Sequence, residues 1–300
     1  MSLFNSLVVA SLPIIPKSIV RIVAQRYIAG PQLVDAVRVT KDLMAKGATS
    51  TIDVLGEFVE SRERAMHETA TQASVIAAIQ QHKLSSYLSV KLTSLGLDID
   101  HEFAYQNLCS LVDEAARHGI FVRMDMENTP YTDITLDFYR RLRRDGRNNV
   151  GVVIQAYLRR SESDIRSLLE CAPSVRLCKG IYVESPEHAF TDPDEIRANY
   201  KKLLGILLSA EGRTHIATHD EELIADAERQ VRERGCDTSR YEFQMLLGVR
   251  EDRRDSLIKA GHGMRIYVPF GEDWYGYSTR RLKENPKVAG YIAKAVLTGR

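Results

Sequence analysis

Two adjacent arginines near the C-terminus are the residues whose types and spacing most directly suggest chemistry. Arg280 and Arg281 lie in the segment YSTRRLKEN, between Tyr277 and Glu284. In a helix these four side chains would fall near one face, because residues three and four positions apart stack. Two guanidinium groups on one face can clamp a carboxylate, since the planar fork of arginine matches it bidentately. The segment alone more commonly indicates the alternative, a solvated charged face.

Other polar residues fall late in segments that read as strands. Most are ionisable or amide side chains, and each alone has an ordinary structural interpretation, such as a rim lysine or a hydrogen-bonded histidine. Together they are many for the mouth of a packed barrel, where a buried polar group needs a partner. The candidates are Lys91, Asp125, Glu127, Gln155, Arg176, Lys179, Thr218, His219, Glu242, Gln244 and Tyr267.

The elements that must position these residues recur eight times along the chain. Each is a short run rich in β-branched and aromatic residues, followed by a helical pattern, which indicates βαβ units and a parallel sheet. Eight such units predict a closed (βα)8 barrel of the triosephosphate isomerase type, with its active site at the carboxyl ends of the strands. The expected strands lie at 50–57, 87–94, 120–127, 150–157, 175–182, 214–220, 241–248 and 264–271.

Two helix starts are marked by their capping residues. Asp192 precedes Pro193 in the segment DPDE, which predicts a helix that begins there and stops at Gly212. The segment from Asp220 to Gly235 has acidic residues first and arginines last, the order that a helix dipole favours. We divide the chain into an N-terminal helical arm at 1–45 and a catalytic barrel at 46–300.

Composition and missing motifs exclude several classes of protein. Lys plus Arg number 41 against 40 Asp plus Glu, so there is no broad basic field for nucleic acid. Four cysteines without CxxC or HxxxH spacing predict reduced thiols in a cytosolic chain and no zinc site. The sequence also lacks GxGxxG after a strand, a P-loop, HExxH and GxSxG, so we expect no Rossmann or P-loop nucleotide site.

The N-terminal segment at 2–24 is apolar enough to be tested as a signal or membrane anchor. No basic region precedes its apolar run, which Pro13 and Pro16 interrupt and Lys17 and Arg21 follow. The run is too short for a span of about 20 residues. We expect an amphipathic helix that packs on the fold, with reversible membrane contact as the alternative.

Eight segments in order resemble the proline dehydrogenase family. They are SVKLTSLG, FVRMDMENT, VVIQAYLRR, VRLCKGIYVE, ATHD, YEFQMLLGV, RIYVPFG and YSTRRLKEN, within about residues 46–298. ATHD alone is a weak signal, whereas VRLxKGxY with a late Tyr-x-x-Arg-Arg-x-x-Glu is specific. The length resembles the monofunctional bacterial form of the family.

The resemblance implies a distorted (βα)8 barrel that holds FAD non-covalently at its C-terminal face. It also implies oxidation of L-proline to Δ1-pyrroline-5-carboxylate, the first step of proline catabolism to glutamate. Hydride would pass to flavin N5 and electrons then to a membrane quinone. We therefore expect a cytoplasmic enzyme, with peripheral contact of the N-terminal arm with the membrane as a further hypothesis.

The resemblance also implies roles for particular residues. Arg280 and Arg281 would clamp the proline carboxylate with Lys91 as a third cation, which makes the clamp the preferred interpretation of the arginine pair. Asp125, which would orient Lys91 or Tyr267, and Arg176 are the expected catalytic residues. The other expected substrate-binding residues are Leu246, Tyr267, Tyr277 and Glu284. The expected FAD-binding residues are Met126, Gln155, Arg176, Lys179, Gly180, Ile181, Thr218, His219 and Gln244.

The charges of these residues suit such a substrate. A bound carboxylate needs cations, and Asp125 and Glu284 would balance the surplus of positive charge. Arg176 and Lys179 could favour the reduced flavin, which is negative near N1. No residue is identified as the base for the substrate amine, whose proton solvent could take. Tyr267 is bulky where a ring hydroxyl would need room, so we expect proline to be preferred over 4-hydroxyproline.

Two other functions remain open from the sequence. A class I aldolase on the same barrel would use Lys91 or Lys179 as a Schiff-base nucleophile. A non-catalytic barrel that senses proline would bind the amino acid without flavin.

Overall fold

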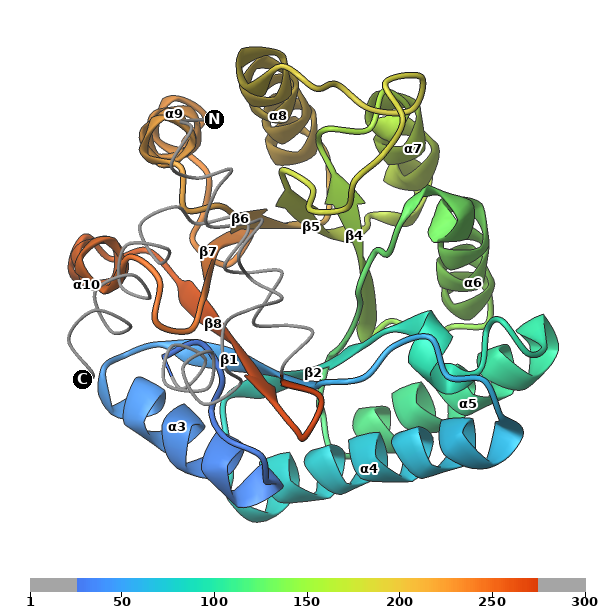
Figure 1. Ribbon diagram of the computed structural model, residues 1–300. Helices are drawn as coiled ribbons and strands as arrows, with labels where there is room; N and C mark the ends of the chain where they lie inside the picture. Colours follow the sequence, from blue (N-terminus) through green and yellow to red (C-terminus); the bar gives the residue numbers. More distant parts are fainter. Residues whose placement is uncertain (1–25, 275–300) are drawn as a thin grey trace, which may run out of the picture.

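Eight parallel strands close into a barrel in the computed structural model, which describes residues 26–274 (Figure 1). Each strand pairs with the next in sequence, and β8 pairs with β1 to close the ring, as Thr51 opposite Tyr267 illustrates. The sequence prediction of a (βα)8 barrel is thus confirmed. The strands are β1 (Thr49–Val54), β2 (Ser86–Val90), β3 (Val122–Met124), β4 (Val150–Gln155), β5 (Ser174–Cys178), β6 (Arg213–Ala217), β7 (Tyr241–Leu246) and β8 (Met264–Phe270).

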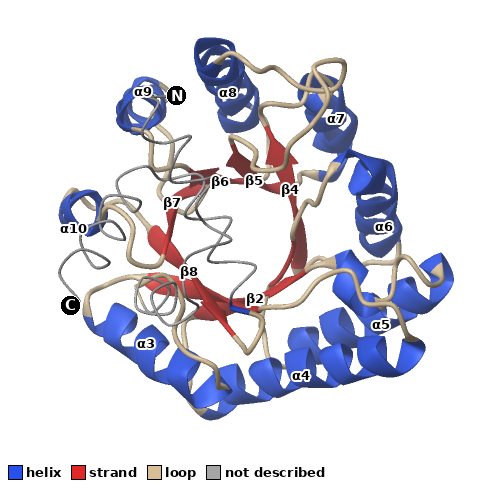
Figure 2. Ribbon diagram, in the orientation of Figure 1, coloured by secondary structure: helices blue, strands red, loops and turns tan. Residues whose placement is uncertain are grey.

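An outer layer of helices surrounds the strands (Figure 2). From α4 onward, one α-helix lies between each pair of consecutive strands. The α-helices are α3 (Leu33–Ala45), α4 (Arg62–Gln81), α5 (His101–Arg117), α6 (Thr132–Arg144), α7 (Ser161–Leu168), α8 (Pro193–Ser209), α9 (Glu221–Glu233) and α10 (Glu251–Lys259). Three short 3-10 helices are η2 (Leu92–Leu95), η3 (Thr129–Tyr131) and η4 (Leu169–Cys171).

The strands end earlier than the sequence predicted. Lys91 follows β2 and precedes η2, and Asp125 follows β3, so both candidate residues lie just beyond their strands. The backbone turns outward there to reach the next helix. Gly96, at φ 95°, ends η2 in the left-handed conformation that glycine adopts most readily. Lys91 and Asp125 are therefore the first residues of their connecting loops, at the same end of the barrel.

The predicted helix starts are confirmed, and one predicted stop is wrong. Asp192 caps α8, because its carboxylate accepts hydrogen bonds from the Asp194 and Glu195 amides. Asp220 caps α9 in the same way. However, α8 ends at Ser209, and Gly212, at φ 113°, instead allows a close approach to Pro173, where a Cβ would lie 2.3 Å from the carbonyl oxygen.

The main hydrophobic core lies between the strands and the helix layer. Ile52, Leu88, Val122 and Ile216 on the strands are fully buried there, and so are the inner faces of the helices. The inside of the barrel is more polar than the packing of branched apolar side chains usual for this fold. It contains the buried polar side chains of Arg123, Arg176, His215, Glu242, Gln244 and Arg265.

Helix α3 packs on the outside of β1 and β8. Its residues Ala36, Val37 and Leu43 belong to the same hydrophobic core as the barrel helices. The division of the chain into an arm at 1–45 and a barrel at 46–300 stays a prediction. The expected membrane-contact segment and the residues Tyr277, Arg280, Arg281 and Glu284 lie outside the described residues.

Within residues 26–274, no helix is both long enough and apolar enough to span a membrane.

Candidate active site

A buried ion pair joins the first two strands at the mouth of the barrel. Both carboxylate oxygens of Asp53, on β1, lie at 2.9 and 3.1 Å from the Lys91 ammonium nitrogen. The side chain of Asp53 is 2% exposed and that of Lys91 is 13% exposed. Although burial opposes the charged amine, the carboxylates of Asp53 and Asp125 raise the pKa of Lys91 above its ordinary value. Lys91 is therefore a permanent cation at this mouth.

The carboxylate of Asp125 accepts hydrogen bonds from side chains on three strands, β2, β5 and β8. Its Oδ1 accepts from the Arg176 guanidinium at 2.8 Å and from the Ser89 hydroxyl at 2.9 Å. Its Oδ2 accepts from the hydroxyl of Tyr267 at 2.8 Å. The guanidinium carbon of Arg176 also lies 5.4 Å from the centre of the Tyr267 ring, within reach of a cation–π interaction. Of the two partners expected for Asp125, Tyr267 is the one to which it is hydrogen-bonded, while Lys91 is bonded to Asp53.

Arg176 is held by hydrogen bonds to two side chains, Gln244 and Asp125. Its Nε donates to the side-chain carbonyl oxygen of Gln244 at 2.7 Å, while its Nη1 donates to Asp125. Both Arg176 and Gln244 are buried, at 8% and 6% exposed. The guanidinium plane is therefore fixed by partners on two sides, which lowers the entropy that a bound anion would have to offset.

The loops after β5 and β6 bring a second group of candidate residues together. Lys179 donates to the carboxylate of Asp220 at 3.1 Å, and the hydroxyl of Thr218 accepts from the Asp220 amide. The Leu246 amide donates to His219 Nε2 at 2.9 Å, which places a neutral ring's proton on Nδ1. These contacts tie the ends of β5, β6 and β7 to one another.

Gly180 sits against an aromatic ring where no side chain fits. Its φ is 117°, and a Cβ at this position would lie 2.0 Å from the ring of Tyr157. The residue before it, Lys179, accepts a hydrogen bond from the Tyr157 amide through its carbonyl oxygen. Glycine at 180 therefore lets the loop after β5 pack directly against the ring of Tyr157.

The remaining candidates line the ends of neighbouring strands. The Gln155 amide donates to the Glu127 carbonyl oxygen at 2.9 Å and so ties β4 to the loop after β3. Met126 is buried, and Ile181 and Leu246 are partly buried. Most candidates within the described residues thus lie at or just beyond the carboxyl ends of β2 to β7, whereas Arg176, Glu242, Gln244 and Tyr267 lie within their strands.

Glu127 is a buried carboxylate for which the sequence suggested no role. It is 1% exposed and accepts from the backbone amide and the hydroxyl of Thr93. Burial raises its pKa to about 7, against the lowering effect of these hydrogen bonds and of Lys91. Thr93 in turn accepts from the Phe58 amide, so Glu127 joins the loops after β1, β2 and β3.

Sequence reasoning missed Asp53 and Tyr182. Asp53 stands in a strand that reads STIDV, and a lone acidic residue in a buried apolar strand was the available signal. Tyr182 closes the motif VRLCKGIY, and burial together with Glu127 and Glu57 raises the pKa of its hydroxyl. The influence of these carboxylates indicates that Tyr182 borders the same mouth.

Comparisons with known proteins agree with this arrangement. A family model described as Proline dehydrogenase matches residues 36–294. The chain belongs to the proline dehydrogenase family. Proline dehydrogenase 1 of Bacillus subtilis (strain 168) is 38% identical over 277 residues, which cover 92% of this chain and 91% of that protein. Proline dehydrogenase of Deinococcus radiodurans is 34% identical and covered to 90%.

Solved structures of larger members share the barrel. Proline utilization A (PutA) from Bdellovibrio bacteriovorus, described as inactivated by N-propargylglycine, superposes with a TM-score of 0.82 at 26% identity. The alignment covers 88% of this chain but only 32% of that one, so the chain spans about a third of this longer relative. The proline dehydrogenase fold therefore corresponds to one part of the larger protein.

Proposed function

We propose that this protein oxidises L-proline to Δ1-pyrroline-5-carboxylate with FAD and passes the electrons to a quinone. The observation that carries the proposal is the partly buried Asp125, which accepts from both Arg176 and Tyr267 at the mouth of the barrel. In a chain of this family, that arrangement supports a rigid, charged site for an amino acid beside a redox cofactor.

The residues at the mouth fit a flavin. Gly180 lets the backbone of the loop after β5 lie against the ring of Tyr157, where a Cβ would clash. Arg176 and Lys179 provide cations, and Thr218 and Gln155 provide hydrogen-bonding groups. Such a set suits the polar edge of the isoalloxazine and the pyrophosphate of FAD. We propose that these residues, with Met126, Ile181, His219 and Gln244, hold FAD, which when bound would accept a hydride from the substrate carbon next to nitrogen.

On the substrate side, the chain's own residues bind and orient. Lys91, kept protonated by Asp53, offers a cation to the proline carboxylate. The arginines at 280 and 281 are proposed to add a bidentate clamp, with Tyr277 and Glu284 beside them. Tyr267, anchored through its hydroxyl to Asp125, presents its ring as a wall for the pyrrolidine. Leu246, partly buried at the end of β7, is proposed to pack on the same ring.

The ion pair of Lys91 argues against the aldolase. A Schiff base requires a neutral amine, and Lys91 donates to both oxygens of a buried carboxylate. Lys179 likewise donates to Asp220, although it is more exposed. Borohydride treatment in the presence of a carbonyl substrate should therefore leave both lysines unmodified, whereas a reduced covalent adduct on either would support the aldolase.

The electron acceptor sets the proposed location. A membrane quinone would require a cytoplasmic enzyme to visit the bilayer surface, and the apolar segment at 2–24 is the proposed contact. Co-sedimentation with liposomes, with and without residues 1–30, tests this contact. Equal binding by both forms would contradict it.

Product analysis tests the proposed reaction. The purified protein, supplied with FAD, L-proline and a soluble quinone, should form Δ1-pyrroline-5-carboxylate and reduced quinone in equal amounts. Asp125→Asn should lower the rate, while a substitution of the exposed Glu187 should not. Proline that binds but is not consumed would favour the non-catalytic binder.

A further inference from the structure

Beneath the candidate site, one carboxylate gathers three hydrogen-bond donors inside the barrel. Oε1 of Glu242 lies 2.6 Å from Arg265 Nε, 2.9 Å from His215 Nδ1 and 2.7 Å from the side-chain nitrogen of Gln244. Glu242 is 3% exposed and His215 is fully buried. Burial opposes its ionisation, yet the contact with His215 and the charge and donors of Arg265 hold the pKa of Glu242 well below its ordinary value.

Both ring nitrogens of His215 have hydrogen-bond partners inside the barrel. Arg123 Nη2 can only donate, and it donates to the Ser174 hydroxyl oxygen at 3.0 Å. That hydroxyl lies 2.9 Å from His215 Nε2. Burial, with the positive charge of Arg123 nearby, lowers the pKa of His215 to about 3, so the ring is neutral and carries one proton. Nδ1 lies 2.9 Å from Glu242 Oε1 and 3.0 Å from the side-chain nitrogen of Gln244. With its proton on Nδ1 the ring donates to the carboxylate and accepts from Ser174, and with its proton on Nε2 it accepts from Gln244.

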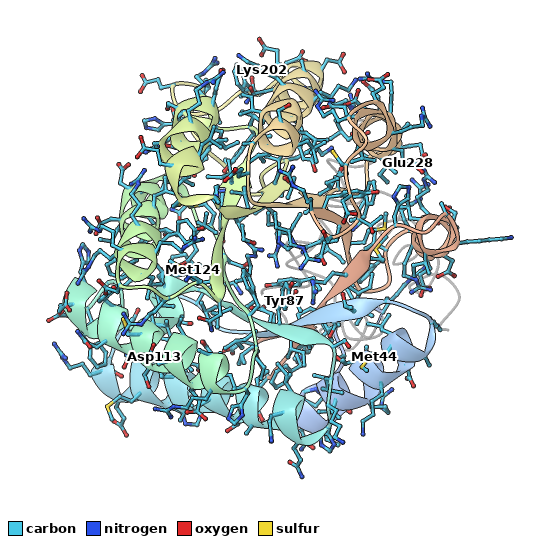
Figure 3. All side chains as sticks on the ribbon, turned by 180° about the vertical axis from the view of Figure 1, so that it is seen from behind. Met44, Tyr87, Asp113, Met124, Lys202 and Glu228 are labelled. Atoms are coloured by element: carbon cyan, nitrogen blue, oxygen red, sulfur yellow. The ribbon has the colours of Figure 1, made fainter. Side chains whose placement is uncertain are left out.

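The rest of the cluster is built around these contacts. A Cβ at Gly151 would lie 2.4 Å from Arg123 Nη1, so β4 carries a glycine where the guanidinium passes. Arg213 donates to Glu242 and to the hydroxyl of Tyr87. Figure 3, drawn from behind, shows Tyr87 near the middle of the barrel, on the side opposite to the view of Figure 1. The cluster thus fills the barrel below the mouth. Both carboxylate oxygens of Glu242 accept hydrogen bonds from within it.

The contacts with Glu242 and Arg176 fix the orientation of the Gln244 amide. With its nitrogen donating to Glu242, its carbonyl oxygen faces Arg176 Nε and accepts from it at 2.7 Å. A reversed amide would place an NH2 group against the N–H of Arg176 and a carbonyl oxygen against a carboxylate. Both contacts would be repulsive in a buried setting, where unpaired polar groups are costly.

We propose that Glu242 is a positioning residue, which orients the amide of Gln244 and, through it, the guanidinium of Arg176 at the mouth of the barrel. Its consequence for catalysis rests on the proposed function, because Arg176 is there the cation beside FAD and Asp125. The hydrogen-bond order itself holds for the protein without cofactor.

The test exchanges the two side chains. Glu242→Gln removes the carboxylate that accepts from the Gln244 amide. Gln244→Glu places two carboxylates side by side without a donor between them. The double variant E242Q/Q244E again has one carboxylate and one amide, and the carboxylate at 244 can accept from Arg176. Each single variant should weaken FAD binding to the apoprotein and lower kcat roughly tenfold. The double variant should recover most of both.

The control is Asp164→Asn on α7. Asp164 is 7% exposed and holds Arg160 through two hydrogen bonds of 2.8 and 3.0 Å, but it lies outside the barrel. This variant should lose stability towards urea and keep the FAD dissociation constant of the wild type. If Glu242→Gln behaves like Asp164→Asn, or if the double variant is no better than the singles, the inference is wrong.

A measurement on the wild type covers the case of variants that do not fold. In 15N NMR of the apoprotein, the Nε–H of Arg176 and the side-chain NH2 of Gln244 should exchange slowly with solvent. Rapid exchange of the Nε–H of Arg176 would overturn the inference. Failure of the wild type to bind FAD would instead contradict the proposed function, while the same NMR signals would still test the position of Arg176.

Discussion

Asp53 holds the ammonium group of Lys91 between both of its carboxylate oxygens, at 2.9 and 3.1 Å. The pair is largely buried at the carboxyl ends of β1 and β2, where Asp125 follows the neighbouring strand β3. A lysine held in this way cannot act as a neutral nucleophile, but it can offer a fixed positive charge to a carboxylate. This relationship explains why a buried apolar strand carries an aspartate.

Removing Asp53 should therefore affect substrate binding more than chemistry. Asp53→Asn leaves the cation without its anchor, so we expect the KM for proline to rise about tenfold while kcat changes less. The matched control is Asp113→Asn, which breaks the pair with Arg147 on the outer helices and should leave both constants unchanged. A fall in kcat at constant KM would contradict the anchoring role.

The hydroxyl of Tyr267 should matter through Asp125. Tyr267→Phe removes a donor that lies 2.8 Å from Asp125 Oδ2 and keeps the ring. We expect kcat/KM for proline to fall by roughly tenfold, the effect of losing one hydrogen bond to a charged group. The wild type should also prefer proline over 4-hydroxyproline, because the ring of Tyr267 occupies the space that a ring hydroxyl needs. Similar efficiency on both substrates would count against this placement.

Glu127 should make stability fall as pH rises. Its pKa is raised to about 7 in the folded protein from an ordinary 4.5, so folding binds a proton between these values. The stabilisation is complete below pH 4.5 and is lost as pH rises through 7. The amide in Glu127→Gln does not titrate. From pH 4.5 to 8 the unfolding free energy of the wild type should therefore fall, relative to that of Glu127→Gln, by up to about 3 kcal/mol.

Urea unfolding of both forms at several pH values measures this difference. The exposed Glu187→Gln serves as the control and should run parallel to the wild type at every pH. A constant offset between Glu127→Gln and the wild type would mean that Glu127 does not titrate in this range.

Two glycines with positive φ separate strain from steric exclusion. Gly180→Ala places a methyl group into the ring of Tyr157, whereas Gly119, at φ 66°, has no atom within 4 Å of the position of a Cβ. Gly119→Ala should cost about 1 kcal/mol of unfolding free energy, from backbone strain alone. Gly180→Ala should cost more than this and should weaken FAD binding. Equal losses of unfolding free energy in the two variants would contradict the close contact between Gly180 and the ring of Tyr157.

The sequence predicted the elements better than their ends. All eight strands were found from runs of β-branched and aromatic residues, and Asp192 and Asp220 were recognised as helix caps. Those signals are local, because strand propensity and capping depend on neighbouring residues. The ends of β2 and β3 were placed too late, since the outward turn that follows each strand is set by packing against the helices.

Partners inside the barrel could not be predicted from the sequence. Asp53 is 38 residues from Lys91, and Asp125 is 142 residues from Tyr267. Pairing of β1 with β2 brings the first two residues together, whereas only closure of the barrel brings the second two together. Which of two neighbouring carboxylates takes the lysine depends on strand register. The expectation for Asp125 therefore allowed two partners, and Tyr267 is the one to which it is hydrogen-bonded.

The most direct test of the account is an absorbance spectrum of the purified protein, recorded before and after L-proline is added without oxygen. The account predicts a flavin band near the usual wavelength of about 450 nm, which proline bleaches. A band that proline leaves unchanged would keep the flavin and contradict the substrate. Absence of the band, even after FAD is supplied, would contradict the proposed function as a whole.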